Sequence, residues 1–451
     1  MVSVVSRCTV FPAQKSALPD LKLSVSDLPM LSCHYIQKGC LFLHPHFPVP
    51  EMLSHLKHSL SIALLHFPPL AGRLVTDSAG YVYITCNDAG VDFIHADGSH
   101  LLAGDLDIPA GLKGFFACDY LVSYQGHFRP LLAVQVTALA DGVFIGCTVN
   151  HAVTDGTSFW NFFNTFAEVS RGGNWISRSP DFSRDSVLIS PAVLKLPDGG
   201  PTVTFDVDAP LKERIFGFSR DSIRRLKAEV NYGCGKSDGG AGAGAIDLVE
   251  LMGKHSHDTR GKSTAEISSF QSLCALLWRG ITRARDLPSS KTTTFRMAVN
   301  CRHRLEPKLN PLYFGNAIQS IPTYATAGNV LSQDLRWCAA ELHKNVVAHD
   351  GATVRKYVAA WERDPRCFPL GNFDGAMITM GSSPRFPMYD NDFGWGKPAA
   401  VGSGPANKFD GKISAFPGRG GNGSVDLEVV LDPNTMAGLE SDPEFMGYVS
   451  G

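Results

Sequence analysis

The sequence has no excess of charge of either sign. Its 451 residues include 41 Lys and Arg against 43 Asp and Glu, which gives a formal net charge of −2. Binding to a nucleic-acid backbone needs a concentrated positive field on the protein. We therefore expect no nucleic-acid partner.

Long hydrophobic runs are also missing. Every apolar run falls well short of the roughly 18 residues that a membrane span needs. The N-terminal residues contain no continuous apolar stretch typical of a secretory signal, and the C-terminal residues match no peroxisomal or ER signal. These absences predict a cytoplasmic protein with no membrane partner.

Paired cysteines are the third absence. The 11 cysteines are scattered singly from Cys8 to Cys367, with no CxxC pair and no cluster with histidine. An odd number at irregular spacing argues against a disulfide framework and against a zinc site. We expect no metal and interpret the cysteines as small buried hydrophobes in a reducing compartment.

The composition that remains is that of a globular protein. Hydrophobic residues make up 44% of the chain and charged residues 19%, and the length suggests two large domains or two to three smaller ones. Strand-like and helix-like segments alternate, which indicates the α/β class. Residues from about 179 onward are rich in Pro, Asp and Ser and poor in periodicity, so we predict domains at 1–190 and 211–451 with a crossover linker at 191–210.

Several elements can be placed by pattern. Apolar spacing predicts a helix around residues 53–64 that ends at the prolines of 67–70, and a second helix after a cap at Ser219. A third helix is expected at 270–284. The Gly- and Asp-rich residues 233–261 are expected to form a surface loop.

The clearest local signal is a hairpin in residues 131–149. Two apolar, β-branched segments flank Asp141-Gly142, a strong two-residue turn. The second segment, residues 143–149, is apolar enough for an inner strand and leads directly into His151. That histidine is therefore expected at the end of a buried strand, where side chains often line clefts.

Two segments could carry chemistry. His151 precedes Asp155 by four residues, and an imidazole with a pKa near 6.5 can act as a general base. Alone, this spacing is a weak signal, because a strand-end histidine bonded to backbone would give it too. The segment 391–398 (NDFGWGKP) holds no good nucleophile and is interpreted as structural. No glycine loop with a strand lysine supports a kinase, and no GxSxG elbow supports a serine hydrolase.

Taken together, four ordered blocks resemble the BAHD acyl-CoA-dependent acyltransferases of plants. The first two are residues 67–73 (FPPLAGR) and 151–156 (HAVTDG), the HxxxD motif. The third is 299–304 (VNCRHR) with 313–317 (YFGNA), where Asn300 stands in place of the commoner aspartate. The fourth is 392–396 (DFGWG). The resemblance spans essentially the whole chain.

The resemblance implies a chloramphenicol acetyltransferase-like fold of two similar domains, each a mixed sheet with flanking helices, and an active-site channel at the domain interface. It implies transfer of an acyl group from acyl-CoA, a co-substrate and not a bound cofactor, to a hydroxyl or amine of a specialised metabolite. His151 would be the general base. The family is usually monomeric.

The same resemblance gives supporting roles to other residues. Asp155 and Asp392 would be structural carboxylates paired with Arg302 or Arg304, and the DFGWG block, with Gly394, Trp395 and Gly396, would support the structure away from the chemistry.

Closer resemblance is to one subgroup, through residues 24–29, 34–39, 141–146 and 382–387. It contains uncharacterised acetyltransferase-like proteins and the isochorismoyl-glutamate pyruvoyl-glutamate lyase, which lacks the motif histidine. The presence of His151 favours acyl transfer, with a lyase on an isochorismate-derived conjugate or a non-catalytic ligand-binding protein as alternatives. Ser32 and His34 are candidate pocket residues, or else ordinary strand residues.

Overall fold

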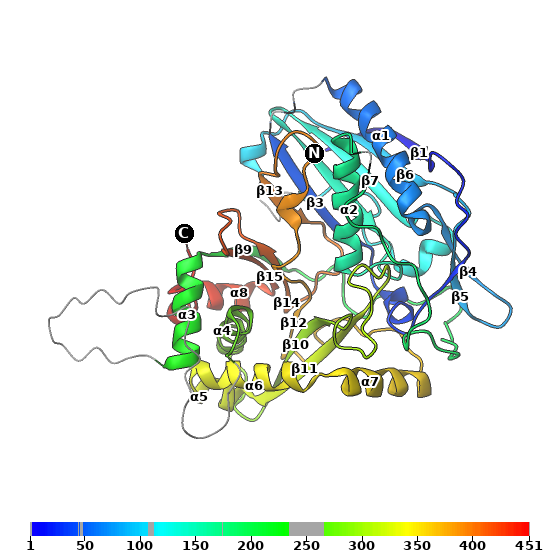
Figure 1. The fold of residues 1–451 in the computed structure, drawn as a ribbon. Helices are drawn as coiled ribbons and strands as arrows, with labels where there is room; N and C mark the ends of the chain where they lie inside the picture. The colour runs from blue at the N-terminus through cyan, green and yellow to red at the C-terminus, as the bar shows by residue number, and fades with distance from the viewer. Residues whose placement is uncertain are drawn as a thin grey trace, which may run out of the picture.

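The computed structural model describes residues 2–43, 45, 48–106, 112–173, 175–233 and 266–450. Two six-stranded sheets, each with helices packed on it, form two lobes (Figure 1). This confirms the predicted α/β architecture of two halves, each a mixed sheet with flanking helices.

The first sheet has the strand order β1-β6-β7-β8-β3-β13. Neighbours are antiparallel except β6 and β7, which run parallel. Helices α1 and α2 pack against each other on the apolar face of this sheet (Figure 1). The elements are β1 (Ser3–Val10), β3 (Ile36–Leu43), β6 (Val91–Gly98), β7 (Leu132–Leu139), β8 (Gly142–Val149), β13 (Ala400–Ser403), α1 (Val49–His66) and α2 (Gly156–Ser170).

The centre of this sheet is the predicted hairpin. Strands β7 and β8 pair antiparallel, with Ala138 opposite Val143, and the turn between them holds Asp141. The Asp141 side chain fixes the turn to its surroundings, since its Oδ1 accepts a hydrogen bond from Ala103 N at 2.7 Å. Strand β8 is buried along nearly its whole length, so it is the inner strand expected before His151.

The last strand of the first sheet comes from the far end of the chain. Strand β13 pairs antiparallel with β3, with Val401 opposite Cys40, and lies beside the blue strand in Figure 1. Phe393 and Val401 also belong to the hydrophobic core of the first half. The predicted division into 1–190 and 211–451 does not anticipate that a strand from the second half joins the first sheet. The four residues of β13 have no strand pattern that would indicate it.

The second sheet has the order β11-β10-β12-β14-β15-β9. Strands β10, β12 and β14 run parallel and the other pairs antiparallel. One face is apolar and covered by helices around the central α4, whose Trp278 is completely buried. The strands are β9 (Lys212–Phe218), β10 (Thr292–Asn300), β11 (Ile318–Thr326), β12 (Met377–Met380), β14 (Lys412–Pro417) and β15 (Val425–Leu431), with α3 (Arg220–Tyr232), α4 (Ser269–Ala284), α5 (Ala327–Ser332), α6 (Leu335–Ala348), α8 (Pro433–Glu440) and α9 (Pro443–Met446).

The predicted helix starts follow local capping chemistry. Ser219 Oγ accepts from Ser222 N at 3.1 Å at the start of α3. Ser268 and Gln271 form a reciprocal capping box at the start of α4. The helix expected at 53–64 is α1, which ends before the 3-10 turn Pro68–Ala71. Most of the loop expected at 233–261 lies outside the described residues.

The remaining elements are a small sheet and a helix that contacts both halves. A small sheet of β2 (Leu21–Lys22), β4 (Arg73–Thr76) and β5 (Val82–Thr85) belongs to the first half. Helix α7 (Gly351–Arg363) packs its buried Val354 and Val358 with Val25 and Leu188 of the first half. Across the described ranges, none of the helices has the length and apolar character of a membrane span.

Candidate active site

His151 lies where β8 ends and the chain turns toward α2. Its backbone is fixed from both halves of the chain. Ser123 Oγ accepts a hydrogen bond from His151 N at 3.1 Å, and Asn316 Nδ2 donates to His151 O at 2.8 Å. Because the turn also packs the buried Ala152 and Val153 into the core, the position of the imidazole is set by the junction of the two lobes.

The hydrogen bonds of the ring define its tautomer. Nδ1 lies 3.1 Å from the carbonyl oxygen of Thr154. A carbonyl can only accept, so Nδ1 carries the proton and Nε2 of the neutral ring carries a free lone pair. In the described part of the chain Nε2 has no hydrogen-bond partner, and it is not sealed from solvent.

The surroundings keep this imidazole neutral. Burial, together with the positive charge of Lys412, lowers the pKa of His151 below its usual value of 6.5. The partly buried ring is therefore unprotonated at neutral pH. A neutral imidazole with an available Nε2 is the form that accepts a proton from a hydroxyl or an amine.

The carboxylate of Asp155 does not orient the imidazole. It caps α2, with Oδ1 accepting from Ser158 N at 3.0 Å, and it forms a two-pronged ion pair with Arg302. Arg302 Nη1 lies 2.6 Å from Oδ2 and Nη2 lies 3.0 Å from Oδ1. Both side chains are buried, at 2% exposure for Arg302 and 0% for Asp155.

Arg302 makes further bonds that tie the ion pair to the second half. Its Nη2 donates to the carbonyl oxygens of Tyr313 and Gly315, at 2.9 and 3.0 Å. On the other side, Asp155 Oδ2 accepts from Ala317 N at 3.1 Å. The start of α2 in the first lobe is thus fastened to the segment 313–317 of the second, directly beside the turn that carries His151.

A second buried carboxylate at this junction was not found from the sequence. Asp27 Oδ1 accepts from Asn316 N at 2.7 Å and from its Nδ2 at 3.0 Å, while Oδ2 accepts from Ser24 N at 2.9 Å. Since Asn316 also holds the carbonyl of His151, Asp27 supports the turn that carries His151 indirectly. The signal was available, because both residues fall in blocks that carry the family resemblance.

The expectation that Asp392 pairs with Arg302 or Arg304 is wrong. Within the described ranges no arginine contacts its carboxylate; Oδ1 instead accepts from Gly394 N at 2.8 Å and Gly396 N at 3.0 Å. The physical reason is position, because the guanidinium of Arg302 is already bonded to Asp155 and to the carbonyl oxygens of Tyr313 and Gly315. Arg304 donates instead to the carbonyl oxygens of Val346, at 3.0 Å, and of His349.

The DFGWG segment is a turn that places two aromatic rings. Gly394 and Gly396 have φ values of +100° and +92°, which side-chain-bearing residues rarely adopt. Their turn lets Phe393 and Trp395 stack, with ring centroids 5.7 Å apart, and both meet Phe42 of β3 edge to face at 5.6 Å. The segment therefore fixes the end of the chain that carries β13 to β3, and it presents no reactive group.

Ser32 and His34 lie in a buried corner of the first half. Ser32 Oγ donates to Phe368 O at 3.3 Å. His34 N donates to Asn407 Oδ1 at 2.9 Å, its Nδ1 accepts from Asn407 N at 3.2 Å, and burial lowers its pKa to about 4. Each joins the first half to a late segment of the chain, and a substrate-binding role for them stays a prediction.

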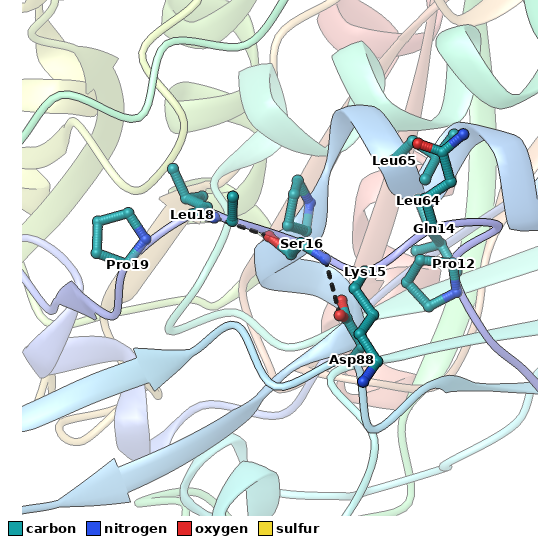
Figure 2. A pocket seen from close by; sticks show the side chains of 11 residues that line it. Pro12, Gln14, Lys15, Ser16, Leu18, Pro19, Leu64, Leu65 and Asp88 are labelled. Carbon is teal, nitrogen blue, oxygen red and sulfur yellow. Dashed lines mark hydrogen bonds between the residues drawn. The ribbon is translucent and has the colours of Figure 1, made fainter.

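One hollow of about 450 Å³ lies between residues 12–19 and the C-terminal end of α1, away from this chemistry (Figure 2). Asp88 Oδ2 closes one side by accepting from Ser16 N at 2.8 Å. The lining is mainly proline and leucine, and it includes neither His151 nor Asp155. In the described residues, no three His, Cys, Asp or Glu side chains gather as metal ligands would.

The whole chain is similar to known acyltransferases in sequence and to solved structures in fold. A model of the Transferase family matches residues 1–446. BAHD acyltransferase DCR of Arabidopsis thaliana is 33% identical over 450 residues, covering 94% of this chain and 88% of the relative. Among solved structures, vinorine synthase has a TM-score of 0.75 at 21% identity, covering 100% of this chain and 99% of that one. F. sporotrichioides TRI101 complexed with Coenzyme A and T-2 has a TM-score of 0.73 at 17% identity, covering 96% and 99%.

Proposed function

The chain belongs to the Transferase family of BAHD acyltransferases, and from this premise we propose that it transfers an acyl group from an acyl-CoA thioester to a hydroxyl or amine of a plant metabolite. His151 is the general base. The observation that carries the proposal is the Nδ1–H bond to Thr154 O, which leaves Nε2 basic and open.

The reaction needs no covalent intermediate on the protein, because a thiolate is already a good leaving group. Nε2 of His151 accepts the proton of the acceptor as its oxygen or nitrogen attacks the thioester carbonyl carbon. The tetrahedral intermediate then collapses and the carbon–sulfur bond breaks. The imidazolium returns its proton to the departing thiolate of CoA, so that protons balance over one turnover.

The use of acyl-CoA is supported by similarity. TRI101, which has the same fold, was crystallised with Coenzyme A and T-2, a donor-side and a second small molecule together. In this chain the imidazole of His151 lies at the junction of two lobes. The monomeric state and cytoplasmic location stay predictions from the sequence, which light scattering and a fluorescent fusion would measure.

The experiment is a mass-spectrometric screen of purified protein with a panel of acyl-CoA thioesters and a plant extract. We expect acylated products and free CoA from the wild type, and a loss of roughly 10²–10⁴-fold in His151→Ala. The matched control is His58→Ala, since His58 is exposed on α1 and its loss should leave turnover unchanged.

Two results would replace the proposal. Product formed without any thioester, with elimination of a fragment from a single substrate, would indicate the lyase. No product and no thermal shift with any thioester would indicate a non-catalytic ligand-binding protein. Full activity of His151→Ala would remove the assigned base.

A further inference from the structure

The second sheet turns a polar face toward the first lobe. Along β14, Ile413 and Ala415 point into the helix-covered core. Residues 412, 414 and 416 therefore point the other way, since side chains alternate along a strand. The register places Ser414 opposite Glu428 of β15, which brings an acidic residue onto the same face.

Two of the carboxylates on this face, Glu428 and Glu213, share one lysine. Glu428 is 2% exposed and is bonded by Lys408 Nζ at 2.8 Å and by Ser403 Oγ of β13. Lys408 also pairs with Glu213 of β9. Lys408 thus forms ion pairs with both Glu213 and Glu428.

Two further lysines face the same region without a direct ion pair, although the charge of Glu428 acts on both. Lys412 places Nζ against Gly381, where an added Cβ would lie 1.9 Å away. Lys38 of β3 reaches across from the first lobe to put Nζ 4.4 Å from the centre of the Phe416 ring. Neither ammonium has an ion-pair or hydrogen-bond partner among the described residues, and neither is sealed from solvent.

These two ammonium groups are partly desolvated. Burial lowers the pKa of Lys38 and of Lys412 to about 8 in each case, so both remain mostly protonated at pH 7. The charge of Lys412 also acts on His151, whose pKa it helps to lower. An unpaired buried cation is costly, and such cost is commonly retained where a ligand supplies the missing charge.

We infer that Lys412, assisted by Lys38, binds a carboxylate of one of the two reactants at the junction of the lobes, near His151. The inference rests on the proposed acyl transfer for what the reactants are. The carboxylate could belong to the acceptor or to a dicarboxylic acyl group, since both carry the same anion. A neutral reactant would leave both ammonium groups with aromatic rings and the charge of Glu428 but no direct ion pair.

The test is a binding measurement that does not depend on turnover. Calorimetry in the presence of CoA compares three hydroxylated aromatic acids of increasing length, beginning with 4-hydroxybenzoate, with their methyl esters. Wild type, Lys412→Met and Lys38→Met are measured beside Lys227→Met, a control that removes a lysine paired with Glu266 on the far face of α3. A parallel arm compares malonyl-CoA with acetyl-CoA.

The wild type should bind at least one acid about 10- to 100-fold more tightly than its ester, the range of a hydrogen bond to a charged group. Lys412→Met should abolish this preference, Lys38→Met should reduce it, and Lys227→Met should keep it. If the preference concerns malonyl-CoA instead, the carboxylate belongs to the acyl group.

Equal binding of acids and esters together with equal binding of malonyl-CoA and acetyl-CoA by the wild type would overturn the inference. A preference that survives in Lys412→Met would also overturn it. Weaker binding of CoA itself in Lys412→Met, with the acid preference intact, would also overturn it and assign the lysine to the CoA phosphates. Because binding is read without turnover, an inactive protein that still prefers acids would reject acyl transfer and keep the carboxylate site.

Discussion

The buried pair of Arg302 and Asp155 gives the sharpest test of how the two lobes are joined. Removing Asp155 leaves the Arg302 charge buried with only neutral oxygen acceptors, and it also leaves Ser158 N and Ala317 N without their acceptor. Truncating one partner of a buried pair costs about 3–5 kcal/mol. We expect Asp155→Ala and Arg302→Met each to lower the free energy of unfolding by this amount.

The double variant separates the pair from the rest of its surroundings. When Asp155 is already absent, loss of Arg302 removes a charge that had no partner. The double variant should therefore cost less than the sum of the single ones, with a coupling of about 0.5–3 kcal/mol. Urea unfolding followed by tryptophan fluorescence measures this, because Trp160 and Trp278 are buried in different lobes.

The matched control is the surface pair Arg224 and Asp221, which are 3.7 Å apart with side chains 58% and 92% exposed. Arg224→Met should cost less than about 1 kcal/mol. Strictly additive costs for the buried pair, or single costs no larger than that of the control, would refute the reasoning that this ion pair fastens the lobes.

Three further predictions concern the site. The pH profile of kcat/KM should have its acid-side midpoint below pH 6.5, since burial holds the pKa of His151 under its usual value and protonation removes the base. In Lys412→Met the midpoint should move up in pH, and an unmoved midpoint would contradict the electrostatic link. Asp392→Ala should cost about 1–3 kcal/mol, because two backbone N–H groups lose their acceptor, while turnover per folded molecule, from active-site titration, should stay unchanged. Gly381→Ala should displace the flexible end of Lys412 and weaken acid binding with little change in melting temperature; a matching loss of stability would mean that the backbone moved instead.

The sequence predicted best what short-range chemistry decides. The Asp141-Gly142 turn, the inner strand before His151 and the Ser219 cap all follow from contacts within a few residues. The family resemblance agreed with the two halves already predicted from composition. It also correctly paired Asp155 with Arg302, although the two candidate arginines could not be told apart.

The features that could not be predicted depend on contacts between residues far apart in the sequence. Nothing in the four residues of β13 indicates that they pair with β3. The predicted arginine partner of Asp392 was wrong because residue types alone do not give the distance between a carboxylate and a guanidinium. The isolation of Lys412 depends on Lys408 taking both nearby glutamates, a result of strand register across three strands.

The return of β13 to the first sheet has a consequence for synthesis of the chain. Until Ala400–Ser403 have left the ribosome, the edge of β3 presents unpaired backbone groups, and open edges invite pairing with other chains. About 200 residues separate the predicted end of the first half from β13, which at about 5–20 residues per second is a delay on the order of 10–40 s. The nascent first lobe therefore waits, incomplete, for its last strand, and a chain that stops before residue 400 should be a client of chaperones and not a smaller enzyme.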